Sequence, residues 1–327
     1  MNELGDYQLT VLSFGAIAFG LYLLIKGGDW TIDAAAFIAE RAGLSKLFIG
    51  ATIVAFGTSA PELFTSVNAN LTGFPGISLG NIVGSNIANI LLILGATAIV
   101  FTIRGKPSEL TRDVVIMVGA TVALVALMIY GVVPRWAGFA MFAVLAAFVA
   151  WQYWTDAGAG EADEHDEDAD EKGIDTMGKG LGFFVAGLTA LVVGSEMLVQ
   201  GAVAAGTAIG VPEAVIGLTV VAVGTSLPEL STCIAAALKR QTNMIIGNIV
   251  GSNAFNILSI IGITAMLKPL TVDPALADLD MWVMAGVTLA FAAWMLTVSR
   301  IGRTAGVLMI LAYVGFIGFT YQDLIVG

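Results

Sequence analysis

The sequence has one cysteine and one histidine in 327 residues, and charged residues make up only 12% of it. The single cysteine, Cys233, excludes an internal disulfide and any metal site built from several cysteines. His165 lies in a run of acidic residues, so we do not expect it to relay protons inside a membrane. Charged residues are also too few to cover the surface of a soluble domain of this length. We therefore expect the chain to lie in a lipid bilayer.

Apolar residues make up 57% of the sequence and are gathered in long stretches. A helix that spans a bilayer needs about 20 consecutive apolar residues. The stretches near or above this length are Leu9–Ile25, 42–69, 76–101, Val114–Val133, Trp136–Tyr153, Leu181–Ile209, 213–237, 243–267, Met281–Val298 and Gly306–Tyr321. The predicted fold class is an all-α polytopic membrane protein with ten transmembrane helices. The first eight residues contain no basic side chain, so we expect the first span to be retained rather than cleaved as a signal.

The two apolar halves contain the same motifs. A shift of 167 residues aligns GTSAPEL at Gly57–Leu63 with GTSLPEL at Gly224–Leu230, and GNIVGSN at Gly80–Asn86 with the same heptapeptide at Gly247–Asn253. Two motifs that recur at one spacing indicate a duplication. Each half holds five predicted spans, and an odd number of crossings makes the second copy enter the membrane from the opposite side. Inverted repeats with a substrate site at the membrane midplane are typical of secondary transporters.

The segment between the halves is strongly acidic, with nine Asp and Glu residues from Asp156 to Glu171. A like-charged run of this kind is expected to be disordered and solvated. Weak binding of calcium by the run is the alternative. We therefore divide the chain into a first five-helix repeat over 1–154, an acidic linker over 155–178 and a second, inverted repeat over 179–327.

The basic residues predict the orientation. With the N-terminus outside, only Arg135 and Lys268 fall in outer loops, and Lys26 lies in the first span. The cytoplasmic connections then hold Arg41, Lys46, Arg104, Lys106, Arg112, Lys172, Lys179, Lys239, Arg240, Arg300 and Arg303. This distribution follows the positive-inside rule. We expect a multi-pass cell-membrane protein with both termini outside and the acidic linker in the cytoplasm.

Two glutamates lie deep in apolar spans, at equivalent positions of the paired motifs. An ionised carboxylate at this depth, such as Glu62 or Glu229, costs about 2.5 kcal/mol or more. No lysine or arginine occurs in 50–97 or 217–238. The expected partner of each carboxylate is therefore a bound cation. A protonated pair, or a pair bonded to hydroxyl groups, is the alternative.

A proline precedes each glutamate. Pro61 and Pro228 have no N–H and break hydrogen bonds of the preceding helical turn. The breaks direct carbonyl oxygens, including those of Thr58 and Thr225, into the bundle, which is tolerated at membrane depth only where a helix, water or an ion satisfies them. Helical spacing also places Thr58 and Ser59 on the same face as the first glutamate.

The second motif adds amide and hydroxyl oxygens. Its glycines, four residues apart, allow close helix packing, which would let Ser85 and Asn89, and likewise Ser252 and Asn256, face the glutamates. Carboxylate, amide, hydroxyl and carbonyl oxygens select hard cations rather than zinc or copper. Two carboxylates neutralise one Ca²⁺. Flanking positions for competing Na⁺ would be formed by the serines Ser59, Ser85, Ser226 and Ser252.

The paired GTS-x-PEL and GNIVGSN-xx-N motifs resemble the alpha repeats of the cation/calcium exchanger superfamily. The likeness is to its sodium/calcium exchanger branch, in a prokaryotic type without cytoplasmic calcium-sensor domains, and it covers the whole ten-span plan. The resemblance implies that Glu62 and Glu229 are the calcium carboxylates and that Thr58 and Thr225 contribute carbonyls. The implied sodium sites are lined by the four serines and by the carbonyls of Ala55 and Ala222.

The expected function is secondary active antiport of Na⁺ for Ca²⁺ by alternating access, with net movement of charge. The first spans of the two halves, about Leu9–Ala39 and Leu181–Ala208, are unusually long and are the expected moving elements. An H⁺/Ca²⁺ antiporter and a cation channel are the alternatives, because a glutamate also exchanges protons and channels also carry intramembrane carboxylates. Some related exchangers have aspartate where this chain has Asn256, which argues against potassium co-transport. No enzymatic site, cofactor, nucleic acid or obligate protein partner is indicated.

Overall fold

The computed structural model describes residues 3–156, 174–208, 224, 226–272, 279–298 and 300–320. These residues are helical except for their loops and four two-residue strands. The linker residues 157–173, the motif residue Thr225 and the segment 209–223 with Ala222 lie outside the described part of the chain. The predicted domain boundaries and the solvated linker therefore stay predictions.

The first half begins with the longest described helix, α1. It spans Glu3–Ala42 and is far longer than the predicted apolar stretch that ends at Ile25. The elements that follow are α2 (Lys46–Ile49), η1 (Gly50–Val54), α3 (Ala55–Thr58), α4 (Ala60–Leu71), α5 (Pro75–Ala88), η2 (Asn89–Ile93), α6 (Leu94–Val100), β1 (Ile103–Arg104), α7 (Pro107–Tyr130), β2 (Val132–Val133) and α8 (Arg135–Asp156). In η1 and η2 the helix widens to π-type hydrogen bonding.

The second half repeats this order over its described residues. It contains α10 (Met177–Ala208), α13 (Leu227–Leu238), α14 (Thr242–Phe255), η4 (Asn256–Ile261), α15 (Gly262–Leu267), β3 (Leu270–Thr271), α16 (Met281–Thr297), β4 (Arg300–Ile301) and α17 (Arg303–Thr320). Like η2, the π-helical turn η4 begins at the asparagine that closes the second motif. The same irregularity at the same motif position agrees with a duplicated sequence.

Two small antiparallel ladders join the halves. Strand β1 pairs with β4, with Ile103 opposite Ile301, and β2 pairs with β3, with Val133 opposite Leu270. A shift of 167 residues places Ile103 on Leu270 and brings β2 onto the start of β4. Each ladder is therefore the counterpart of the other, with the roles of the two halves exchanged.

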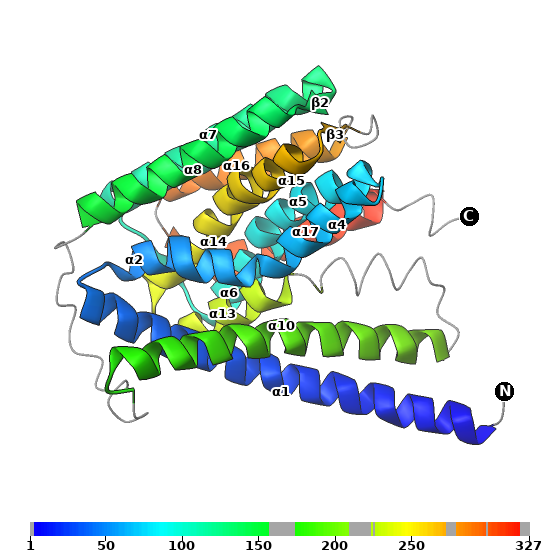
Figure 1. Cartoon of the computed structure of the whole chain (residues 1–327). Helices are drawn as coiled ribbons and strands as arrows, with labels where there is room; N and C mark the ends of the chain where they lie inside the picture. The colour runs from blue at the N-terminus through cyan, green and yellow to red at the C-terminus, as the bar shows by residue number, and fades with distance from the viewer. Residues whose placement is uncertain are drawn as a thin grey trace.

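The helices α1 and α10 pack against each other at glycines. In Figure 1 they run side by side in opposite directions along one edge of the molecule. A Cβ atom added to Gly20 would lie 2.6 Å from the Gly194 carbonyl oxygen, and one added to Gly27 would lie 2.9 Å from that of Gly187. Small residues let helix backbones approach this closely in membranes. The same 167-residue shift converts each glycine pair into the other.

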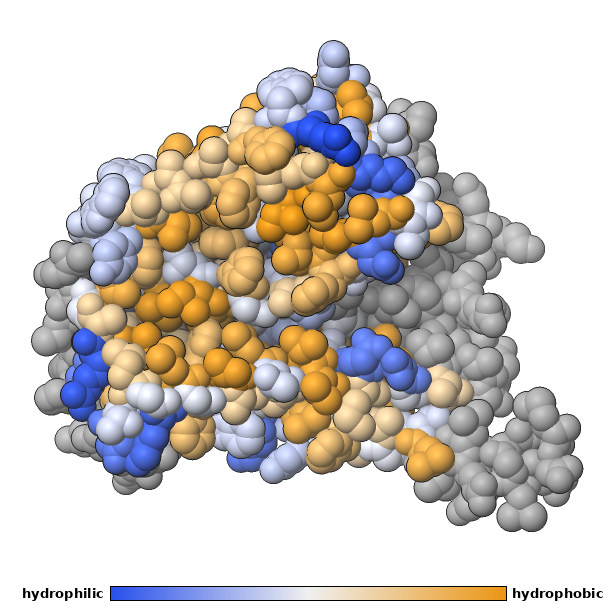
Figure 2. All heavy atoms as spheres, viewed as in Figure 1, coloured by the Kyte–Doolittle hydropathy of each residue, from blue (hydrophilic) through white to orange (hydrophobic). Residues whose placement is uncertain are grey.

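The motif-bearing helices form the interior. In the most apolar part of each long helix, the buried share of residues is 83% in Thr242–Leu267 and 78% in Pro75–Val100. In the other long apolar helices this share is 17–39%. Figure 1 shows α7 and α8 on one side of these helices and α1 and α10 on the other. Figure 2 shows apolar side chains over most of the visible face, with hydrophilic residues towards its two ends. Such a surface suits a bilayer, in which the outer helices contact lipid.

Among the described residues, seven helices are long and apolar enough to cross a membrane, or eight if one bent pair is a single span. That pair is Lys46–Thr58 with Ala60–Leu71, bent by 46°, where the sequence predicts a span over 42–69. Helices α13 and α16 are apolar but shorter, and part of the predicted 213–237 span lies outside the described residues. The count of ten spans remains a prediction.

Candidate cation site

Two helix breaks place the predicted glutamates. Helix α3 ends at Thr58 and α4 begins at Ala60, and the intervening Ser59 has the non-helical angles φ −84° and ψ 10°. In the second half Ser226 precedes α13 with nearly the same angles, −88° and 6°. Each break is followed by a proline in the first helical turn, where a missing N–H is tolerated. The break expected at Pro61 is therefore present, and in the described part of the second half Ser226 has the same non-helical angles before α13.

Each glutamate is the third residue of the helix that starts at its break. Glu62 and Glu229 are both 1% exposed. The first turn of a helix carries a partial positive charge from its unpaired N–H groups, which favours a carboxylate there. Broken helices whose ends meet inside a bundle are the usual way in which transporters build ion sites.

The two breaks meet across the halves. Ser59 donates a hydrogen bond from Oγ to Glu229 Oε1 over 2.8 Å, and both residues are buried. One buried region thus contains four of the predicted cation ligands. They are the two glutamates and the serine before each of them, Ser59 and Ser226. The first motif of one half supplies a hydroxyl to the carboxylate of the other.

Two asparagine pairs join the second motifs. Asn89 donates from Nδ2 to Asn253 Oδ1 at 3.2 Å, and Asn256 donates from Nδ2 to Asn86 Oδ1 at 3.0 Å. All four side chains are 1% exposed. Asn86 and Asn253 are not among the predicted site residues. Their position could have identified them in the sequence, because each lies one helical turn before a predicted amide ligand.

Several buried oxygens of the site accept no hydrogen bond from the protein. In the described part of the chain these atoms include Asn89 Oδ1, Asn256 Oδ1, Glu229 Oε2 and Ser226 Oγ. A buried polar atom without a partner costs about 1–3 kcal/mol, so several in one region call for a ligand. The described residues contain no cluster of three or more His, Cys, Asp and Glu side chains. The donor set is therefore carboxylate, amide and hydroxyl oxygen, which fits Na⁺ or Ca²⁺.

The remaining predicted ligands differ in how their oxygens are used. Ser85 is buried on α5, and Ser252 donates its hydroxyl to Asn248 Oδ1 at 3.1 Å. The Ala55 carbonyl accepts from the Ser59 amide at 3.1 Å and from Thr58 Oγ1 at 3.3 Å. A sodium ion at Ala55 would therefore have to share or displace the Thr58 hydroxyl. Thr225 and Ala222 lie outside the described residues.

Two further asparagines, also not predicted as site residues, pack the motif helices together. Asn81 donates from Nδ2 to Ser66 Oγ at 3.0 Å and links α5 to α4. Asn248 donates from Nδ2 to Thr232 Oγ1 at 2.8 Å and links α14 to α13. These are equivalent positions of the two motifs, and each bond holds a glutamate-bearing helix against the helix that carries the amide ligand.

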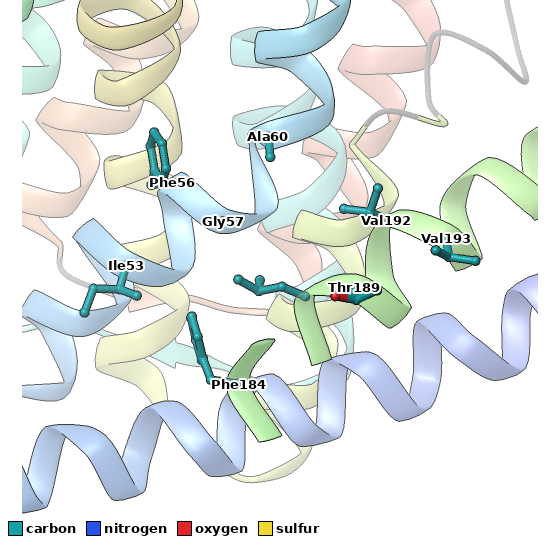
Figure 3. A pocket seen from close by; sticks show the side chains of 9 residues that line it. Ile53, Phe56, Gly57, Ala60, Phe184, Thr189, Val192 and Val193 are labelled. Atoms are coloured by element: carbon teal, nitrogen blue, oxygen red, sulfur yellow. The ribbon is translucent and has the colours of Figure 1, made fainter. Parts of the chain in front are cut away.

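An apolar cavity of about 450 Å³ lies beside the first break. Figure 3 shows Ile53, Phe56 and Ala60 on one wall and side chains of α10, including Val192 and Val193, on the other. Thr189 is the one polar side chain among the described residues that line it. The cavity is thus a gap between α10 and the helix break rather than the ion site itself.

The sequence profile described as "Sodium/calcium exchanger protein" matches residues 12–154 and 179–322. The chain belongs to this family of membrane exchangers. Its sequence is 34% identical to the "Putative antiporter CaxA" of Alkalimonas amylolytica, over 92% of this chain and 96% of that protein. It is 30% identical to the "Sodium/calcium exchanger MaX1" of Methanosarcina acetivorans, over 94% of this chain and 98% of that one.

A solved structure of the sodium-calcium exchanger NCX_Mj, soaked with 10 mM Na⁺ and no Ca²⁺, has the same fold. Its TM-score is 0.81 at 30% identity, with 94% of this chain and 99% of that chain covered. The family and the fold are those of transporters and not of enzymes. The expected membership of the sodium/calcium exchangers is confirmed, and a multi-pass helical membrane protein is confirmed with it.

Proposed function

We propose that the protein is an antiporter that exchanges Na⁺ for Ca²⁺ by alternating access, with Glu62 and Glu229 as the calcium carboxylates. The observation that carries this proposal is the contact of Ser59 Oγ with Glu229 Oε1. It joins the broken helix of one half to the buried carboxylate of the other. Family membership supports the exchange of cations for calcium.

The proposed calcium site combines two negative charges with neutral oxygens. The two carboxylates balance one Ca²⁺, and the amide oxygens of Asn89 and Asn256 with the carbonyls of Thr58 and Thr225 complete the six to eight ligands that calcium prefers. Mg²⁺ suits this site less, because it keeps its waters and demands stricter geometry. The proposed sodium positions involve Ser59, Ser85, Ser226 and Ser252 with the carbonyls of Ala55 and Ala222.

Sodium and calcium would compete for the same carboxylates. A carboxylate that binds Ca²⁺ is not available to Na⁺, and the reverse also holds. Binding of one ion therefore favours release of the other. Such mutual exclusion couples the two fluxes without any cofactor. The ions are the transported substrates, and the function requires no partner protein.

We further propose that the halves are inverted five-helix repeats that together form ten spans. The reciprocal contacts support this arrangement: both ladders and both glycine pairs exchange their partners under the 167-residue shift. The basic residues support an orientation with both termini outside and the acidic linker in the cytoplasm. In this arrangement the site lies where the two halves meet near the membrane midplane.

The test is calcium uptake by proteoliposomes that contain the purified protein. With pH and potassium equal on both sides, an outward sodium gradient should drive radioactive calcium inwards, and replacement of internal sodium by choline should abolish the uptake. A Glu229→Gln preparation, matched for protein content, measures the leak. Uptake driven by a proton gradient and indifferent to sodium would instead identify an H⁺/Ca²⁺ antiporter. Calcium entry without sodium counterflow would identify a channel.

A further inference from the structure

Four of the six asparagines in the second motifs form two bonds with the same direction of donation. On one side Asn256, the first residue of η4, donates to Asn86 on α5. On the other side Asn89, the first residue of η2, donates to Asn253 on α14. In both, the donor is the residue proposed as a cation ligand and the acceptor is the asparagine one turn before the ligand of the opposite half.

The direction of donation decides which end of each amide remains for a cation. A primary amide offers one oxygen acceptor and an NH₂ group with two donors, and the two ends exchange places when the group turns over. Only the oxygen attracts a cation. In both pairs the NH₂ end of the ligand residue is held by its partner, and the oxygens of Asn89 and Asn256 accept no hydrogen bond in the described structure.

A main-chain group fixes the direction of one pair. Asn86 donates from Nδ2 to the backbone carbonyl of Asn253 at 3.4 Å, and a backbone carbonyl cannot become a donor. If the Asn86 amide turned over, its oxygen would face that carbonyl and its NH₂ would face the NH₂ of Asn256. Both contacts would then be repulsive. The Asn253 carbonyl thus fixes the Asn86 amide, and Asn86 Oδ1 in turn holds the NH₂ group of Asn256. Asn256 Oδ1 therefore points away from Asn86.

The second pair is directed by sulfur. Asn253 donates from Nδ2 towards Met117 Sδ at 3.9 Å, and a thioether is only an acceptor. This leaves Asn253 Oδ1 to receive the NH₂ of Asn89. Asn86 has a similar additional acceptor in Met284 Sδ at 4.0 Å. Each acceptor asparagine is thus held by groups of fixed polarity on the side away from its ligand residue.

We propose that Asn86 and Asn253 are positioning residues of the cation site, which hold the amides of Asn256 and Asn89 so that their oxygens face the transported ion. The inference rests on the proposed function, because it takes these two oxygens as ligands. It also gives a reason for an amide at position 256. An ionised aspartate at position 256 has no N–H to donate to Asn86 Oδ1. Its negative oxygens would instead face the partly negative Asn86 Oδ1 and repel it.

The experiment is a double-mutant cycle on cation binding. Calcium affinity of the full-length protein in detergent is measured by isothermal titration for the unmodified chain, Asn86→Leu, Asn256→Ala and the double variant. Loss of a group that orients a metal ligand typically weakens binding about 10- to 100-fold. We expect Asn86→Leu to weaken calcium binding at least tenfold in the unmodified background and less than about twofold once Asn256 is alanine. Thermal unfolding shows that each variant is folded.

Asn70→Leu is the matched control. Asn70 is also a 1% exposed asparagine whose Nδ2 bonds the opposite half, at the Lys268 carbonyl over 2.7 Å, but its partner is no proposed ligand. We expect its calcium affinity to stay within about twofold of the unmodified chain. Equal losses from Asn86→Leu in both backgrounds, or a loss from Asn70→Leu of the same size, would show a general packing role and overturn the proposal.

A second pair keeps the test decisive if Asn86→Leu does not fold. Asn253→Leu with Asn89→Ala forms the equivalent cycle, and the same non-additivity is expected. Failure of the positioning role is distinct from failure of the proposed function. An unmodified chain that binds no calcium refutes the function, whereas normal calcium binding by Asn86→Leu and Asn253→Leu refutes only the inference.

Discussion

Lys239, the residue after α13, places its Nζ 2.6 Å from Asp33 Oδ1 on α1 and 3.0 Å from the Asp29 carbonyl oxygen. About two helical turns away, Ser231 donates its hydroxyl to the Leu24 carbonyl and joins the same two helices. The shift of 167 residues puts Thr72 at the position of Lys239 and Gln200 at that of Asp33. The ion pair joins the two halves but has no counterpart at the equivalent positions, unlike the strand ladders and the glycine contacts.

Loss of the Lys239 ammonium should loosen α1 from α13. The pair is partly exposed, with side chains 20% and 11% accessible, so its contribution is about 1 kcal/mol or less after solvent screening. For Lys239→Met we expect hydrogen exchange of the α1 amides near Asp33 to quicken by up to about fivefold. The control is Lys179→Met, which removes the exposed pair between Lys179 on α10 and Asp175 just before that helix. Equal exchange of these α1 amides in Lys239→Met and the unmodified protein would contradict the expectation.

Neutralising either carboxylate should abolish exchange. Glu62→Gln and Glu229→Gln each remove one of the two charges that oppose a divalent ion, while the side-chain shape is preserved. We expect sodium-driven calcium uptake in proteoliposomes to fall to the level of empty vesicles. Near-normal uptake by either variant, at equal protein incorporation, would refute the assignment of the site.

The acidic linker should be dispensable for transport. A solvated, like-charged segment contributes little to a site between buried helices. Replacement of 161–171 by a neutral flexible segment of equal length should leave sodium-driven calcium uptake largely unchanged. Because the surrounding helices are retained, complete loss of uptake in a normally inserted variant would assign the linker a direct role.

Exchange should respond to membrane potential. One Ca²⁺ is balanced by the two carboxylates, whereas the additional serine positions allow more than two Na⁺, so the sodium-loaded site carries net positive charge. Each elementary charge moved across the whole potential changes the free energy by about 2.3 kcal/mol per 100 mV. In vesicles clamped by potassium diffusion potentials, an inside-positive potential should therefore speed calcium uptake against sodium exit. Rates that do not change with potential would favour an electroneutral two-for-one exchange.

Close packing of α1 on α10 should be sensitive to a single methyl group. A Cβ at Gly20 would lie 2.6 Å from the Gly194 oxygen and 2.7 Å from the Leu198 nitrogen, so a backbone must move. Overpacking of this kind costs about 1–3 kcal/mol, and we expect Gly20→Ala to lower the midpoint of thermal unfolding in detergent. Gly15→Ala on the same helix is the matched control, because nothing lies within 4 Å of its added Cβ. Similar midpoints for the two variants would contradict this account.

The sequence predicts those parts of the site that are unusual inside a membrane. A glutamate after a proline in an apolar span stands out chemically, and α4 and α13 both begin at the residue before the proline, as these prolines predict. The apolar stretch ends at Ile25, but the long first span of about Leu9–Ala39 expected from the sequence agrees with the end of α1 at Ala42. What the sequence does not show is that Lys239, more than 200 residues away, pairs with Asp29 and Asp33 on this helix.

The asparagine pairs are beyond the reach of sequence reasoning for a different reason. Asn86 and Asn253 are visible as letters of the motif, but their partners lie in the opposite half of the chain. Spacing along one helix shows which residues share a face and does not show which end of an amide points to a neighbour. That direction depends on a backbone carbonyl and on Met117 and Met284, which follow only from the packed structure.

The reciprocal glycine contacts of α1 and α10 have a consequence for the origin of the chain. Gly20 meets Gly194 and Gly27 meets Gly187, and the shift of 167 residues turns each contact into the other. A surface that binds its own copy in this way is isologous, the kind of interface found in two-fold symmetric homodimers. In the proposed inverted arrangement, it is the interface that two copies of an ancestral five-helix subunit would form after inserting in opposite orientations. Gene fusion then needed to add only a connecting segment, and mutations such as the one that placed Lys239 in a single half became possible once the copies could diverge.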